Sequence, residues 1–206
     1  MENHISLNIT LGILGGGQLG KMLTDITRRW DIRTHILDPN NEAPAKNSCN
    51  QFMQGDLMDY DTVLKFGKTV DILTIEIEHV NINALYELEK SGIIVYPKPE
   101  ILDIIQNKQT QKAFFKEQKI PTAPFVSLQN KKELKTKVNA GMINFPCIWK
   151  AACFGYDGFG VKKLKSKTDI NLLPDQPCII ESLIPINEEI AIIAARNKSG
   201  DVALYP

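Results

Sequence analysis

The sequence has no excess of charge of either sign and no long hydrophobic run. Lysine plus arginine and aspartate plus glutamate number 24 each, so the formal net charge is zero. Such a chain is not built to bind a polyanion, and we expect no nucleic acid or membrane partner. No run approaches the roughly 20 apolar residues of a membrane helix. The first residues also lack the pattern of a secretory signal, and we expect a cytoplasmic protein.

Cysteine is scarce and is not spaced for metal or redox chemistry. The four cysteines are Cys49, Cys147, Cys153 and Cys178, and no two stand in a C-x-x-C pattern. We therefore predict ordinary, partly buried thiols and assign no metal ligands to this chain. Apolar residues make up 43% of the 206 residues, which predicts a packed core in one large or two small domains.

Short apolar runs alternate with helical patterns in the first half of the chain. Strands are predicted at 9–14, 34–37, 71–75 and 93–96, and helices at 18–29, 59–68 and 81–91. In the first helix, one face carries Leu19, Met22, Leu23 and Ile26. This alternation predicts an α/β fold with a parallel sheet covered on both faces. Ligands of such sheets bind beyond the carboxyl ends of the strands.

A glycine turn follows the first predicted strand. Gly15, Gly17 and Gly20 match G-x-G-x-x-G, which lets the backbone approach a phosphate and directs free N–H groups of the helix start towards it. Asp38 lies 18 residues after Gly20, where an acid in a dinucleotide-binding protein holds the ribose hydroxyls. On these residues alone, an NAD site and a turn without a ligand are both open.

Two acids follow the strand predicted at 71–75. Glu76 and Glu78 are two residues apart, so their side chains point the same way if the segment is extended. They could face a nucleotide substrate at the sheet edge. The alternative is a solvated strand end.

The second half carries a lysine on a strand and a second glycine-rich segment. A helix is predicted at 107–119, with Ala113, Phe114 and Phe115 towards a core. The strand predicted at 145–150 ends in Lys150, and the glycine loop 155–160 follows it. A lysine is a point charge for phosphate oxygens, and glycine backbone can close over them at little steric cost. This combination predicts a grip on a triphosphate.

The next segment predicts a hinge between two strands. Residues 178–184 are a strand running into the hinge, and 189–195 form a further apolar strand that Arg196 follows. Glu188 precedes the second strand and Glu189 is its first residue. Without further context these two acids are equally consistent with a solvated strand edge.

Together these strings resemble the N5-carboxyaminoimidazole ribonucleotide synthase family of ATP-grasp ligases. Residues 15–22 resemble the family's G-G-G-Q-L-G-[RK]-M, and residues 74–80 resemble its T-x-E-x-E-[HN]-V. Residues 107–112 and 121–124 resemble the entry into its ATP-grasp region. Residues 146–161 resemble P-x-[IV]-x-K followed by G-Y-D-G-K-G-Q, with departures at Phe154, Phe159 and Val161. These departures keep a non-catalytic remnant among the alternatives.

The resemblance implies three structural parts and a set of site residues. The parts are a Rossmann-like parallel-sheet preATP-grasp domain at 1–106, a small ATP-grasp lobe at 107–180 and the start of the large lobe at 181–206. The ribonucleotide would be bound by Gly17, Gln18, Leu19, Asp38, Glu76 and Glu78. ATP would be held by Lys108, Lys150, Gly155, Gly158, Gly160, Glu181, Ser182, Leu183, Ile184 and Glu189. The catalytic residues would be Tyr156, Asp157 and Arg196.

The activity implied is ATP-dependent carboxylation of 5-aminoimidazole ribonucleotide with bicarbonate, in de novo purine biosynthesis. The products would be the N5-carboxy ribonucleotide, ADP and phosphate. Magnesium would assist, and its ligands are expected outside these 206 residues, so we expect the isolated chain to be inactive as a synthase. The resemblance also implies a homodimer for the whole enzyme. The alternatives are an ATP-grasp ligase with another acceptor and an NAD-dependent oxidoreductase, although the latter gives no role to Lys150 or Glu189.

Overall fold

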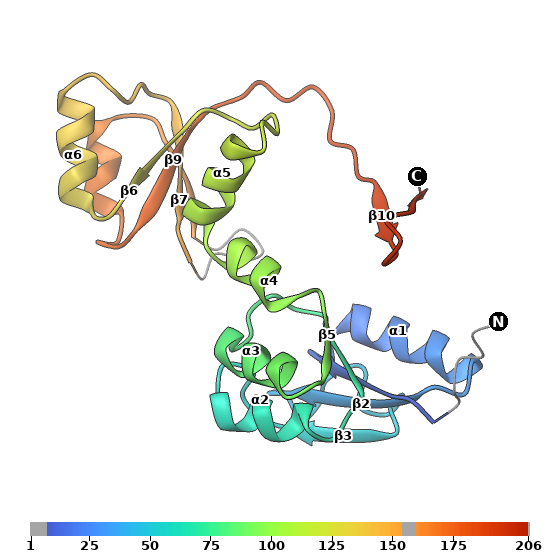
Figure 1. Ribbon diagram of the computed structural model, residues 1–206. Helices are drawn as coiled ribbons and strands as arrows, with labels where there is room; N and C mark the ends of the chain where they lie inside the picture. The colour runs from blue at the N-terminus through green and yellow to red at the C-terminus, as the bar shows by residue number, and fades with distance from the viewer. Residues whose placement is uncertain (1–7, 154–159, 206) are drawn as a thin grey trace.

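The first half of the chain forms a parallel sheet. The computed structural model describes residues 8–153 and 160–205 (Figure 1). Five strands pair in the order β3-β2-β1-β4-β5, and every pair is parallel. Their bounds are Thr10–Leu14 for β1, Arg33–Asp38 for β2, Gln51–Gln54 for β3, Ile72–Ile75 for β4 and Ile94–Tyr96 for β5. The predicted α/β parallel sheet is therefore confirmed.

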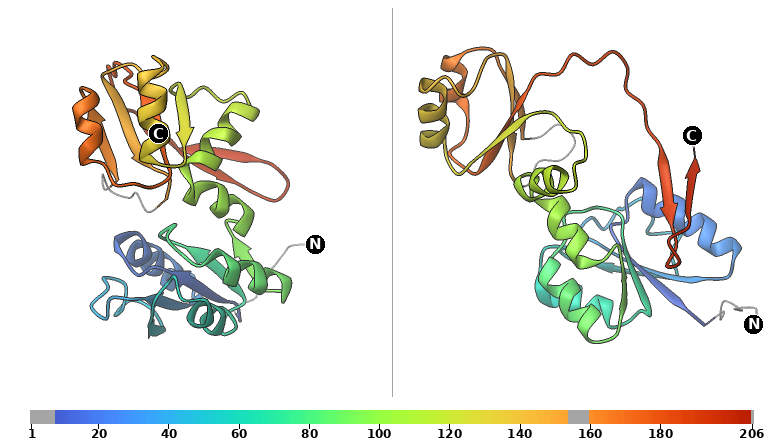
Figure 2. Two further views of the ribbon diagram at one scale, coloured as in Figure 1. Left: turned by 90° about the vertical axis from the view of Figure 1, so that its left-hand side faces the viewer. Right: turned by 45° about the horizontal axis from the view of Figure 1, so that its top comes forward.

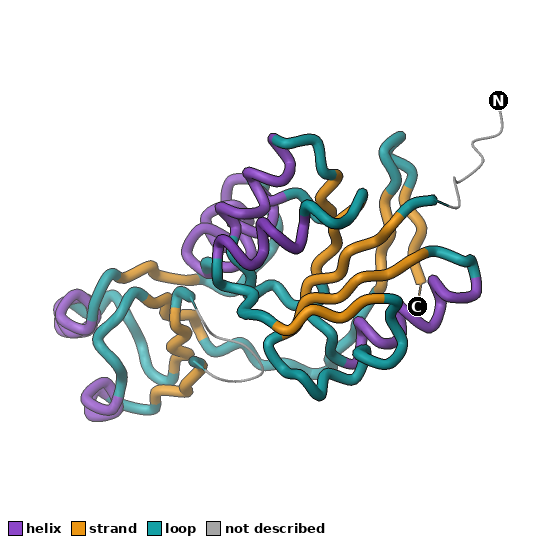
Figure 3. Tube along the Cα trace, turned by 90° about the horizontal axis from the view of Figure 1, so that it is seen from below, coloured by secondary structure: helices purple, strands orange, loops and turns teal. Residues whose placement is uncertain are grey.

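Helices cover both faces of this sheet. Helix α1 (Gln18–Arg29) lies on one face, and α2 (Tyr60–Gly67) and α3 (Ile82–Lys90) lie on the other, as the view from below shows (Figure 3). The second face holds the larger core, in which Leu14, Leu37 and Leu73 of the strands share a cluster with the helix residues Val63, Phe66, Leu85 and Leu88. Burying each such side chain contributes about 1.5–3 kcal/mol, which fixes α2 and α3 on the sheet.

Helix α1 has its apolar side towards solvent. Its face of Leu19, Met22, Leu23 and Ile26 is 64%, 55%, 36% and 42% exposed, whereas the residues it buries are Gly20, Thr24 and Thr27. A Cβ at Gly20 would stand 2.8 Å from the carbonyl oxygen of Gly15, so the helix approaches the glycine turn too closely for a larger residue. The threonine hydroxyls donate to backbone carbonyls of the same helix, which satisfies them where they are buried.

The second half forms an antiparallel sheet. Four strands pair in the order β6-β9-β7-β8, with bounds Phe125–Leu128 for β6, Cys147–Ala151 for β7, Val161–Leu164 for β8 and Cys178–Ser182 for β9. Helix α6 (Lys131–Asn139) and the short helix η1 (Lys167–Leu172) cover one face over a core that includes Trp149 and Ile180. Helix α4 (Pro99–Gln106) and helix α5 (Lys108–Glu117) connect the two sheets, and α5 contacts β9 (Figures 1 and 2).

The last part of the described chain is an isolated hairpin. Strands β10 (Ile193–Arg196) and β11 (Val202–Tyr205) pair with each other and are exposed along their whole length. The strand predicted at 189–195 is wrong in its extent, because residues 183–192 are irregular and the strand begins only at Ile193. An extended segment becomes a strand only where a neighbour accepts its hydrogen bonds, and β11 offers partners from Ile193 onwards. No helix in the described ranges combines the length and the apolar character that crossing a membrane requires.

Candidate functional site

The glycine turn, residues 15–20, lies at the carboxyl edge of the parallel sheet and is hydrogen-bonded to Asp38. Gly15 has φ of +101°, a left-handed conformation that glycine adopts without strain. The N–H of Gly16 donates to Asp38 Oδ2 at 2.6 Å, and the N–H of Asn40 donates to Oδ1 at 2.7 Å. Both oxygens of Asp38 therefore accept backbone hydrogen bonds, and the Gly16 N–H is directed at a carboxylate.

A second carboxylate, that of Glu76, lies over the same turn. A Cβ built on Gly15 would stand 2.5 Å from Glu76 Oε2, and one built on Gly17 would stand 2.7 Å from Oε1. Strand β4 ends at Ile75 and the backbone bends at 76–78, so the predicted extended segment from Glu76 to Glu78 is wrong. Glu78 is exposed, and its carbonyl accepts a hydrogen bond from Gln106 at 2.6 Å. The bend gives the two glutamates different environments.

The start of α1 leaves backbone donors available beside this acidic turn. Gly17 is the N-cap residue and no side chain caps the helix, whose first turn contains no acid. Gln18 and Leu19 follow and are exposed. The first N–H groups of a helix have no partner within it and carry partial positive charge, so an anion is favoured there.

The second candidate site is built around the buried carboxylate of Glu181, on the sheet face opposite α6. Its side chain is 6% exposed and forms ion pairs with two lysines, Lys112 of α5 and Lys150 of β7. The Lys150 Nζ lies 2.5 Å from Glu181 Oε2. Lys112 pairs with Oε1 and also donates to the hydroxyl of Thr122. Three charged groups from three elements thus meet at one point.

The two lysines outweigh the effect of burial on Glu181. Burial alone would raise the pKa of this carboxyl group, but hydrogen bonds and positive charge from Lys112 and Lys150 lower the pKa below its ordinary value. The group is therefore ionised at neutral pH. Lys150 is the more accessible partner, with its side chain 29% exposed against 11% for Lys112.

The strand register explains why these groups share a face. In β7 and β9, Lys150 pairs with Ile179 and Ile148 pairs with Glu181, and paired residues of an antiparallel sheet point to the same side. Ile180 and Trp149 point to the opposite side, into the core under α6. The face with Lys150 and Glu181 is therefore the one that α6 leaves uncovered, and α5 packs against β9 on this face.

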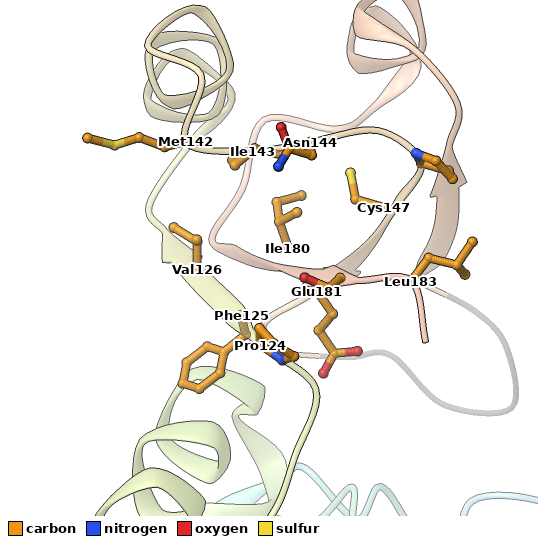
Figure 4. A pocket seen from close by; sticks show the side chains of 12 residues that line it. Pro124, Phe125, Val126, Met142, Ile143, Asn144, Cys147, Ile180, Glu181 and Leu183 are labelled. Atoms are coloured by element: carbon orange, nitrogen blue, oxygen red, sulfur yellow. The ribbon is translucent and has the colours of Figure 1, made fainter. Parts of the chain in front are cut away.

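A cavity adjoins the end of β9. It has a volume of about 270 Å³ and lies between β6, β9 and the segment that joins α6 to β7. Ser182 and Leu183 line it, together with Ile180 and Cys147. The carboxylate of Glu181 points away from Ile180 and Cys147 (Figure 4). The predicted hinge thus has an open space beside Ser182 and Leu183.

The remaining predicted site residues are dispersed. Ser182, Leu183 and Ile184 are exposed at the end of β9, and Glu189 is exposed in the irregular segment that follows. Arg196 lies within β10 rather than after the strand. The N–H of Lys108 donates to the carbonyl of Ala152 at 2.7 Å, which places Lys108 at the start of α5 near the end of β7.

The glycine loop is described only at its end. Gly155, Tyr156, Asp157 and Gly158 lie outside the described residues. Gly160 has φ of +75°, and its carbonyl accepts from the N–H of Ala151 at 2.8 Å. Among residues 8–153 and 160–205, no group of three His, Cys, Asp or Glu side chains is arranged to hold a metal ion.

Sequence reasoning missed Lys112 and misplaced Ala113. Helix α5 was expected to direct Ala113 with Phe114 and Phe115 to a core, but Ala113 is exposed and Lys112 is buried. The helix faces a charged strand rather than an apolar core, so its polar residues point inward. The signal available was the i, i+4 spacing of Lys108 and Lys112, which places two lysines on one face.

The parallel sheet with a glycine turn, followed by an antiparallel sheet with lysines around a buried acid, has the domain order of the ATP-grasp proteins. The ribonucleotide synthetase preATP-grasp domain matches residues 8–106, and the ATP-grasp domain matches residues 113–206. The chain therefore belongs to the ATP-grasp superfamily. The exact domain boundaries at 106 and 180 stay a prediction.

Within that superfamily, the chain matches the N-terminal part of the N5-carboxyaminoimidazole ribonucleotide synthases. It is 33% identical over 204 residues to a phosphoribosylaminoimidazole carboxylase of Candida glabrata, covering 96% of this chain and 36% of the relative. It superposes on a carboxyaminoimidazole ribonucleotide synthase of Aspergillus clavatus complexed with ATP with a TM-score of 0.86 and 31% identity, covering 97% of this chain and 53% of that one. A second Aspergillus clavatus structure, in complex with ADP and 5-aminoimidazole ribonucleotide, gives a TM-score of 0.84 and 30% identity, covering 96% and 52%. The chain thus spans about half the length of these two solved structures. It spans a smaller share of the Candida glabrata relative.

Proposed function

We propose that this chain supplies the ribonucleotide-binding domain and the nucleotide-binding lobe for ATP-dependent carboxylation of 5-aminoimidazole ribonucleotide with bicarbonate. The products are the N5-carboxy ribonucleotide, ADP and phosphate, in purine biosynthesis. The observation that carries the proposal is the partly exposed Lys150 beside the buried Glu181, on the uncovered face of the ATP-grasp sheet. The similarity to a solved synthase complexed with ATP supports it.

The nucleotide is held by groups along the uncovered face. Lys150 and Lys108 meet the phosphate oxygens as positive charges, and the peptide groups of residues 181–184 meet the adenine edge. Glu189 accepts from the ribose hydroxyls, because a carboxylate has acceptors for both hydroxyls of a vicinal diol. Gly155, Gly158 and Gly160 are assigned to the same phosphates in this proposal. Phosphoryl transfer depends on such positioning and charge neutralisation more than on covalent chemistry by the protein.

The ribonucleotide is held at the glycine turn in an orientation set by charge. Asp38 and Glu76 make the top of the turn acidic, which suits hydroxyl and amine donors and repels phosphate. The phosphate end therefore binds the N–H groups of Gly17, Gln18 and Leu19 at the start of α1. Glu78 is available to the sugar as a further acceptor.

Bicarbonate activation is assigned in this proposal to Tyr156, Asp157 and Arg196, the residues that the resemblance implies as catalytic. Magnesium is part of this chemistry in the proposal, but the described residues do not form a site for it, since they contain no cluster of three candidate ligands. We therefore route no step of this chain through the metal. We also propose a homodimeric assembly and a cytoplasmic location for the whole enzyme.

A dinucleotide oxidoreductase is the weaker proposal. It requires the Gly16 N–H for the pyrophosphate and Asp38 for a ribose, but these two groups are hydrogen-bonded to each other. Glu76 also lies close over Gly15, where its carboxylate would repel a pyrophosphate at the top of the turn. The geometry of the turn thus favours the ribonucleotide over NAD.

Calorimetric titration of the chain with ATP and magnesium, and separately with NAD, tests the proposal. We expect ATP to bind, Lys150→Met to weaken ATP binding at least tenfold, and NAD to give no heat. Lys162→Met is the matched control, because Lys162 of β8 pairs with Trp149 of β7 and so points to the face opposite Lys150. NAD binding without an ATP response would overturn the proposal. A titration with 5-aminoimidazole ribonucleotide, lost in Glu76→Gln, tests the acceptor separately.

A further inference from the structure

The carboxylate of Glu181 has two lysine partners that differ in their freedom to leave it. Lys150 is 29% exposed on the uncovered face, where a ligand can reach it. Lys112 is 11% exposed, donates to Thr122 and has its ammonium group 5.9 Å from the ring centroid of Phe125. A phosphate on the uncovered face can attract the first lysine, whereas the second is enclosed by protein.

Helix α5 is held on the sheet by hydrogen bonds, so Lys112 cannot move with its helix towards a bound ligand. The side-chain amide of Gln109 donates to the carbonyls of Leu128 in β6 and Cys178 in β9, both at 2.9 Å. The N–H of Lys108 donates to the carbonyl of Ala152. These bonds fix the helix turn that carries Lys112 against the strand that carries Glu181.

A buried carboxylate that loses its only partner is strongly disfavoured. If Lys150 turned to the phosphates of a nucleotide and Glu181 had no other partner, its charge would be left unpaired at 6% exposure. The second lysine removes this penalty, because it neutralises the same carboxylate from the protein side.

We propose that Lys112 is a positioning residue that keeps Glu181 charged and in place while Lys150 transfers from Glu181 to the nucleotide phosphates. Lys112 does not touch the nucleotide and acts through Glu181. The inference rests on the proposed nucleotide binding at Lys150. It adds that Lys150 exchanges Glu181 for the phosphates, and that Lys112 makes this exchange possible. The lowered pKa of Glu181 agrees with a carboxylate held by both lysines in the free protein.

A double-mutant cycle on ATP affinity tests the inference. Lys112→Met is compared with wild type, and the same substitution is compared in the Glu181→Gln background, where no buried carboxylate needs a partner. We expect Lys112→Met to weaken ATP binding at least tenfold in the wild-type background and less than threefold in the Glu181→Gln background. Lys116→Met is the matched control, because it removes an exposed lysine one turn further along α5.

The outcomes separate the inference from the function on which it rests. An equal loss of affinity in both backgrounds, or no loss in either, would overturn the role of Lys112 while leaving ATP binding intact. Absence of ATP binding by the wild-type chain would overturn the proposed function itself, and the inference with it. If circular dichroism shows that Lys112→Met is unfolded, Lys112→Gln replaces it in the cycle, because its amide can still bond to Thr122.

Discussion

Replacing Glu181 by glutamine should destabilise the second sheet measurably. The substitution keeps the shape of the side chain and removes the charge that Lys112 and Lys150 share. Removing one partner of a fully buried ion pair costs about 3–5 kcal/mol. Lys150 is 29% exposed and can return to water, so only Lys112 stays buried without a countercharge. With the amide oxygen still accepting a hydrogen bond, we expect a loss of about 2–3 kcal/mol.

Tryptophan fluorescence during urea unfolding measures this loss locally. Trp149 lies in β7 next to the site and is 2% exposed, whereas Trp30 is 65% exposed on α1. A Trp30→Phe background therefore leaves one reporter, in the second sheet. Glu117→Gln, at the exposed end of α5, is the control and should change stability by less than about 0.5 kcal/mol. If Glu181→Gln lowers the free energy of unfolding by less than about 0.5 kcal/mol, the ion pairs of Glu181 do not stabilise the second sheet and the prediction is refuted.

Three further predictions follow from the pKa values and from the turn. The lowered pKa of Glu181 means that its stabilising effect is present at neutral pH and is lost as pH falls below about 4.5, so urea midpoints of wild type and Glu181→Gln should converge there. In thermal unfolding, Gly15→Ala should destabilise the protein by about 1–3 kcal/mol more than Gly92→Ala. Both glycines have positive φ, but only at Gly15 would an added Cβ clash with a neighbouring side chain. Equal losses of stability would contradict this prediction. Burial raises the pKa of Cys178 to about 11, so iodoacetamide at pH 8 should label Cys49 well before Cys178, as peptide mass mapping would show.

Much of the parallel sheet was predictable because its signals are local. The apolar runs gave four of its strands close to their observed positions, while β3 was missed because residues 51–54 lack an apolar run. Helix α1 was found by its periodicity, but the side it buries was not predictable from that pattern. The close approach of Gly20 to the turn decides the orientation, and this is a tertiary contact that periodicity does not encode.

The candidate site was only partly predictable. Lys150 was identified from its strand and the glycine loop that follows it, Glu181 was identified through the family resemblance, and the structure brings the two together. Lys112 was missed because a lysine on a helix is usually solvated, and its burial depends on how α5 docks on β9. The bend at 76–78 was missed for a similar reason, since Glu76 turns towards glycines that are distant in sequence.

The most direct test of the account is a crystal structure of this chain with a non-hydrolysable ATP analogue. We predict that the analogue lies on the uncovered face of the second sheet, with Lys150 on its phosphates and Lys112 still paired with Glu181. An analogue bound at the glycine turn of the first sheet, with the Lys150–Glu181 pair intact, would contradict the account.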